Sequence, residues 1–175
     1  MARTNPIPSA FPTQDEINAF CNHAKIGDTA LVTQYLDRFG VAIIDSRDST
    51  QDTALSWAAW TGQKHIVALL LERGADIDKT GMTDRTALAW AANGGRREVV
   101  EFLLDKGANS EPKDKNGSTA ADLAQNTGHA ELAAFIRENG TQKRKAAAEQ
   151  AAKEKAEQEG RELAALRLDA LKKSK

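Results

Sequence analysis

The sequence predicts an all-α solenoid of about four helix-turn-helix units with hairpin loops, followed by a C-terminal charged helix. Three observations carry this prediction. An internal repeat of constant period is shared by three kinds of marker residue, and apolar residues follow a helical period inside each repeat. After residue 140 the composition changes to Ala, Glu, Lys, Gln, Arg and Leu, which are strong helix formers.

The repeat is visible in blocks that read TALSWAAWTG, TALAWAANGG and TAADLAQNTG. Each block opens on a threonine, whose hydroxyl is suited to cap a helix N-terminus. A first glycine follows where a short helix is expected to end, and a second glycine is expected to stop the next helix. The markers are Thr53, Thr86 and Thr119, then Gly62, Gly95 and Gly128, then Gly74, Gly107 and Gly140, and each set has the same even spacing.

Each element of the unit has its own sequence signal. The first helix is rich in Ala, so that neighbouring helices can approach closely. The second helix has paired apolar residues at helical spacing, such as Ile66 and Val67 followed by Leu70 and Leu71. The stretch from Ala75 to Arg85 is polar and predicts a loop or hairpin, and Asn116-Gly117 marks the same turn one unit later.

A degenerate first unit lies over residues 19–40, where Gly27 and the apolar residues after it keep the spacing of the later repeats. Terminal units are commonly atypical because one of their sides meets water. We therefore expect one repeat domain over residues 14–140, with units at about 14–47, 48–80, 81–113 and 114–140. Residues 1–13, rich in proline, are expected to be disordered.

The charged tail covers residues 141–175. We expect a helix from about residue 142, interrupted or kinked near Gly160. The repeat domain and residues before it carry a charge of -5, whereas the tail carries +4. A solvated helical extension is one interpretation. The alternatives are self-association or partner contact through Leu163, Leu166, Leu168 and Leu171, and weak anion binding through Lys143-Arg144-Lys145 and Lys172-Lys173.

Composition limits the class of protein. The net charge of -1 does not favour a chain that coats nucleic acid or an anionic membrane. The single cysteine, Cys21, allows no internal disulfide and fits a reducing compartment. The N-terminus lacks the apolar run of a secretory signal, and no stretch has the ~18 apolar residues of a membrane span. We expect an intracellular, cytoplasmic protein, with the nucleus left open.

The repeat resembles the ankyrin repeat, a motif of ~33 residues whose signature ends on Leu-Leu, two further residues and Gly-Ala. The match covers roughly residues 19–140, and its second half is present at Leu70-Leu71 with Gly74-Ala75 and again at Leu103-Leu104 with Gly107-Ala108. The family's Pro and His are replaced, by Ala54 and Ser56 in the second unit. The resemblance implies a rigid scaffold that binds a partner protein through a concave face and its hairpin tips, without catalytic activity.

Candidate partner-binding residues follow from that resemblance. Trp57 and Trp90 occupy the same slot of consecutive units, and Trp60 shares a helix face with Trp57. Tryptophan is enriched at binding hot spots, although these rings would also fill the seam between stacked helices. The other candidates lie at loop tips or at a helix end. They are Asp48, Ser49, Asp52, Met82, Thr83, Arg85, Asn93, Lys115, Asn116 and Ser118.

The sequence lacks the motifs of common catalytic and metal sites, including HExxH, paired CxxC, GxSxG and a phosphate-binding glycine loop. We therefore expect no enzyme activity, no cofactor, no metal and no small-molecule substrate. The leading hypothesis is a module that binds another protein, as an adaptor or regulatory subunit. The alternative is association with nucleic acid, with an anionic membrane or with a second copy through the tail.

Overall fold

A computed structural model describes residues 11–173 of the chain. Helices account for most of this part, and no strand longer than an isolated bridge occurs in it. The chain divides into two compact units between Arg137 and Glu138, slightly before the boundary that the composition change predicts. The prediction of disorder falls largely on residues 1–10, which lie outside the described range. Thr13, at its end, caps the first helix.

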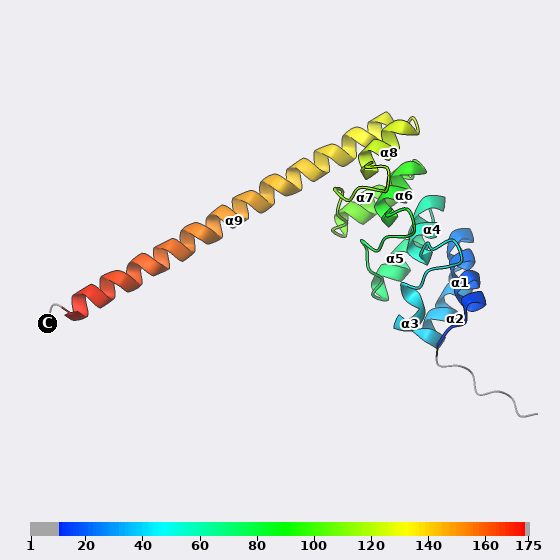
Figure 1. Cartoon of the computed structure of the whole chain (residues 1–175), viewed down its shortest axis with the longest axis horizontal. Coiled ribbons are helices and arrows are strands. Elements are labelled where there is room, and N and C mark those ends of the chain that lie inside the picture. The colour runs from blue at the N-terminus through cyan, green and yellow to red at the C-terminus, as the bar shows by residue number, and fades with distance from the viewer. Residues whose placement is uncertain (1–10, 174–175) are drawn as a thin grey trace, which may run out of the picture. The chain divides into compact units, whose positions relative to one another are not determined.

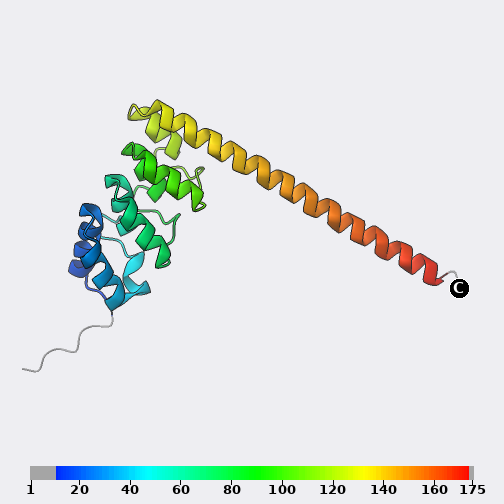
Figure 2. The same ribbon diagram turned by 180° about the vertical axis from the view of Figure 1, so that it is seen from behind.

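The predicted helix pairs are present, and the solenoid is confirmed. Within the repeat unit the pairs follow one another in chain order, side by side (Figures 1 and 2). One additional short helix, α3, was not predicted. The helices are α1 Gln14–Ile26, α2 Thr29–Phe39, α3 Val41–Ile44, α4 Ala54–Thr61, α5 Lys64–Glu72, α6 Ala87–Asn93, α7 Arg97–Asp105, α8 Ala120–Asn126 and α9 Ala130–Lys173.

The ends of the short helices are set by the marker residues of the repeat. The hydroxyls of Thr53, Thr86 and Thr119 accept hydrogen bonds from the backbone N–H three positions later, as the capping pattern predicts. Gly62 ends α4 with a φ of 87°, in the left-handed region that glycine adopts without strain. The chain therefore reverses at once and begins the next helix.

The core lies between two rows of helices. We call α1, α4, α6 and α8 the inner helices; each contacts the next in order. They can approach closely because small residues such as Ala58 and Ala91 occupy their buried faces. The outer helices contribute larger apolar side chains, including Leu70 and Leu103, which are fully buried. No unit buries its apolar face alone, so the stack depends on its shared core.

The loops between units end in three tight turns, which we call the tips, at residues 48–52, 81–85 and 114–118. Backbone hydrogen bonds close each tip, as between Asp114 N–H and the Ser118 carbonyl. Neighbouring tips are tied together, because Met82 N–H donates to the Gln51 carbonyl and Lys115 N–H donates to the Thr83 carbonyl. The hairpins are thus minimal, since Arg47 and Thr53 form the one isolated bridge in residues 11–173.

The same position of each tip has a positive φ, but glycine occupies it in the third tip alone. Gln51 has a φ of 67°, whereas Gly117, two units later, has a φ of 79°. We expect Gln51→Gly to raise the free energy of unfolding by about 0.5–1 kcal/mol, because strain at an exposed left-handed residue is relieved. Urea denaturation measures this. Ser49→Gly in the same tip is the control and should be destabilising, since Ser49 has no positive φ.

The second glycine of the repeat does not always end a helix. The structure contradicts the expected stop at Gly140 and the expected interruption at Gly160, because α9 continues through both. A glycine within a helix costs only ~1 kcal/mol relative to alanine, and strong helix formers surround both positions. Gly74 and Gly107 are different because a polar turn follows them.

The tail predictions that depend on side chains remain predictions. The Leu163, Leu166, Leu168 and Leu171 stripe and the clusters Lys143-Arg144-Lys145 and Lys172-Lys173 have side chains outside the described set, although their backbone is helical. Over the described residues, no helix has the length and apolar character required to cross a membrane.

Candidate functional site

Three tryptophans meet where inner helices α4 and α6 lie side by side. Trp57 and Trp60 lie one turn apart on α4, and Trp90 repeats the Trp57 slot on α6. The centroids of the Trp57 and Trp60 rings are 5.5 Å apart, and those of Trp60 and Trp90 are 6.2 Å apart, both pairs inclined at 61°. Such edge-to-face contacts are favourable between aromatic rings. The rings therefore support one another in a fixed arrangement.

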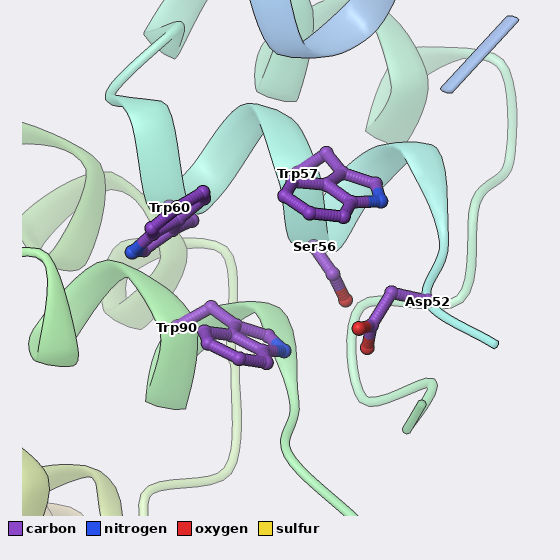
Figure 3. A pocket seen from close by; sticks show the side chains of 5 residues that line it. All are labelled: Asp52, Ser56, Trp57, Trp60 and Trp90. Carbon is purple, nitrogen blue, oxygen red and sulfur yellow. The ribbon is translucent and has the colours of Figure 1, made fainter. Parts of the chain in front are cut away.

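The three rings surround a small pocket. With Asp52 and Ser56 they line a cavity of about 140 Å³, and Figure 3 shows these five side chains facing a common space. The surface is accessible, since Trp60 is 37% exposed. Ser56 is buried, and its hydroxyl oxygen accepts a hydrogen bond from the Thr53 hydroxyl at 3.1 Å. We call these five residues the tryptophan pocket.

Asp52 supplies the negative charge of the tryptophan pocket. Burial raises the pKa of its carboxyl, and repulsion from Asp48 adds to this increase, whereas the Trp90 indole N–H, Arg85 and Arg47 oppose it. Asp52 Oδ1 and Trp90 Nε1 are both buried, and neither has a partner at hydrogen-bond geometry. The carboxylate therefore keeps an open acceptor inside a mostly aromatic pocket, which is costly for folding.

This cost gives a pH-dependent prediction for Asp52→Asn. Because the pKa of Asp52 is raised in the folded state, the ionised form lowers stability at neutral pH. The variant should therefore be more stable than the wild type at pH 7. The difference should close as the pH falls through the raised pKa of Asp52, where the wild-type carboxyl becomes neutral.

Thermal unfolding of both proteins between pH 7 and pH 4 measures the difference in Tm. The groups that act on Asp52 are Asp48, Arg47, Arg85 and the buried Cys21, and all are retained in the variant. A variant less stable than the wild type at neutral pH would contradict the prediction.

Cations already lie on two of the rings. Lys25 Nζ, from α1, is 4.3 Å from the centroid of Trp57, and Arg85 Cζ is 4.8 Å from that of Trp90. Lys25 lines a separate hollow that shares Trp57 with the tryptophan pocket. Arg85 is also paired with Asp114 at 3.0 Å. The indole faces here are thus used for cation–π contacts.

The loop-tip candidates fall into two groups. Ser49, Lys115 and Asn116 are exposed, as is Met82 at 59%. The others are partly or fully covered, and they are Asp48, Asp52, Thr83, Arg85, Asn93 and Ser118.

Asp48 lies inside its tip, which is a correction to its expected place among solvated tip residues. Its Oδ1 accepts from the backbone N–H of Thr50 and Asp52, and its Oδ2 accepts from Trp57 Nε1 at 2.8 Å. Asp48 is 7% exposed. This carboxylate therefore holds the tip closed and fixes the orientation of Trp57.

Sequence reasoning brought together part of this arrangement and missed the rest. Trp57, Trp60, Trp90 and Asp52 meet in one pocket, whereas Lys115, Asn116 and Ser118 belong to the next tip. Lys25 was missed, although it has the same position relative to Gly27 as Trp60 has relative to Gly62. Asp114 was missed too, although it lies two repeat periods after Asp48. Repeat spacing would have found both.

Pairs of antiparallel helices repeated at a constant period, with tips tied by backbone hydrogen bonds, define the class of helical-repeat scaffolds. The family model for ankyrin repeats, in three copies, matches residues 7–81 and 78–147. The chain therefore belongs to the ankyrin-repeat family. No curated protein matches it significantly. Among the described residues, no group of three or more His, Cys, Asp or Glu is arranged to hold a metal.

Proposed function

We propose that this chain is an adaptor or regulatory subunit that binds a partner protein through the inner helices and the tips. Ankyrin repeats are generally protein–protein interaction modules and are typically non-catalytic. The observation that carries the proposal is the tryptophan pocket, since solvent-accessible tryptophans in a rigid setting are characteristic of binding hot spots. We further propose a cytoplasmic location.

The size of the stack supports this proposal. A specific interface buries about 800 Å² on each partner. The candidate surface includes the exposed tip residues Ser49, Met82 and Lys115 beside the tryptophan pocket. Because the tips are tied to one another by backbone hydrogen bonds, their binding would cost little ordering entropy.

Affinity capture from the native lysate tests the proposal. We expect the double variant Trp60→Ala with Trp90→Ala to lose most of its bound partner, by about tenfold or more, because two anchors are removed. Far-UV circular dichroism should remain that of a helical stack. Phe102→Ala, an aromatic change on outer helix α7, is the control and should retain the partner. Equal capture by all three proteins would reject the inner face as the site.

The tail provides an independent arm of the experiment. A chain truncated after residue 140 should capture the same partner if the repeats carry the binding. Loss of the partner on truncation, together with a steep dependence on salt, would instead support binding through the basic tail.

A further inference from the structure

We propose that the tryptophan pocket binds an alkylated ammonium group, the side chain of a dimethylated lysine presented by the partner protein. This inference rests on the proposed function, because it names the chemistry that one part of the partner would present. Three indole faces and one carboxylate in the same small space are the features that favour such a group.

The rings provide the attraction for a cation. Trp57, Trp60 and Trp90 line three sides of the pocket (Figure 3). A cation within ~6 Å of an indole centroid is attracted by the electrons of the ring, and indole is the best of the aromatic side chains for this contact. Lys25 and Arg85 lie within such distances of Trp57 and Trp90. A purely hydrophobic guest would leave this property of the rings unused.

The supply of hydrogen-bond acceptors decides which cation fits. Asp52 Oδ1 is buried in the pocket and has no partner, whereas the Ser56 oxygen already accepts from Thr53. An unmodified lysine ammonium has three N–H donors and arginine has five, so either would leave donors unsatisfied among the rings. A dimethylammonium group has a single N–H, which Asp52 Oδ1 can accept, and its methyl groups pack on the indoles.

Size and charge agree with this choice. The cavity of about 140 Å³ has room for roughly four groups of ~30 Å³ each. A dimethylammonium nitrogen, its two methyl groups and the adjoining methylene need that amount of space. The acidic balance of residues 1–140 favours the approach of a lysine-containing segment.

Space for Asp52 in the pocket depends on Gly81. A β-carbon at Gly81 would collide with Asp52 Oδ1, so a larger residue there would displace the carboxylate. Asp48 and Asp114 occupy the equivalent position in the other two tips, and each uses its carboxylate to close its own tip. The middle tip has given up that aspartate, and the carboxylate of Asp52 lies where it would have been.

Nuclear magnetic resonance of the full chain tests the proposal directly. The chain has three tryptophans, so the spectrum of the ¹⁵N-labelled protein has three indole N–H signals that report on the pocket. The probes are N-acetyl-lysine methyl amides with zero, one, two or three methyl groups on Nζ. A further probe is the neutral analogue in which a tert-butyl group replaces the ammonium group.

We expect the dimethyl compound to shift the Trp60 and Trp90 signals at the lowest concentration. The unmodified compound and the neutral analogue should bind about tenfold more weakly. Asp52→Asn should remove most of the preference for the dimethyl compound over the neutral analogue, whereas Met82→Ala, at an exposed site in the next tip, should change nothing. Unchanged amide signals elsewhere establish that the variants are folded.

Equal binding of unmodified and dimethylated compounds would overturn the proposal, as would equal binding of the neutral analogue. Tighter binding of free choline would assign the pocket to a small metabolite and would also overturn it. Failure here is distinct from failure of the proposed function. Loss of partner capture in the tryptophan variants, without any shift from the lysine compounds, would retain the inner face as a protein-binding site and reject the methylated lysine.

Discussion

Asp114→Ala is expected to lower the free energy of unfolding by about 3 kcal/mol. The Asp114 side chain is 1% exposed, and it pairs with Arg85, itself 17% exposed, at 3.0 Å. Its Oδ1 also accepts from the backbone N–H of Asn116 and Ser118. Alanine would open the third tip and leave a largely buried guanidinium without its carboxylate, which is more costly than losing an exposed ion pair.

The pKa of Asp114 supports this expectation. Burial alone would raise it and is the largest single effect, but hydrogen bonds from Ser118, Arg85 and Asn116 together outweigh burial and hold the pKa below its usual value. A carboxylate with a lowered pKa stabilises the fold above the usual value of 3.8, and this contribution is lost as the pH falls through the lowered pKa.

Urea denaturation at pH 7 measures the effect, and two variants control for its cause. Asp114→Asn keeps an oxygen that can accept from the backbone and should lose less than alanine does. Glu101→Ala breaks the exposed pair with Arg97 and should cost less than ~0.5 kcal/mol. If Asp114→Ala were as mild as Glu101→Ala, the tip would not depend on this carboxylate.

Leu104→Ala is the second change expected to have a large effect, at about 3 kcal/mol. Leu104 is 1% exposed on α7, inside the core that all units share. Truncation removes apolar contacts and leaves a cavity that the close-packed helices cannot fill. Because α7 belongs to a middle unit, the loss should weaken the packing of the units on both of its sides.

The repeat itself provides the matched control. Leu71 occupies the slot of Leu104 one unit earlier, but it is only partly buried, so Leu71→Ala should cost about 1 kcal/mol. Tryptophan fluorescence reports on α4 and α6, whereas circular dichroism reports on all helices. Equal costs for the two variants, measured by fluorescence in urea, would show that burial does not set the effect.

The regular part of the fold could be predicted because each local signal repeats with the same period. Thr53, Thr86 and Thr119 predicted three helix starts, and all three are confirmed by their side-chain hydrogen bonds. Gly140 shares the period of Gly74 and Gly107 but does not end its helix. A glycine stops a helix only where the following residues favour a turn, and those after Gly140 favour more helix.

The candidate site could be predicted only in part, because it depends on contacts between units. Helical spacing placed Trp57 and Trp60 on one face, and their ring contact confirms this. The inward position of Asp48 depends on hydrogen bonds within its tip, and the open oxygen of Asp52 depends on the absence of a side chain at Gly81. These are distances in space, which the order of residues does not state.

The continuity of α9 limits how such a protein can change its length. Residues 130–173 remain helical throughout, so the backbone never doubles back to found another module downstream of the fourth. Gene duplications that lengthen the array must therefore insert their copies upstream of Ala130. A copy placed later would have to create a reversal where forty-four consecutive residues now follow one axis.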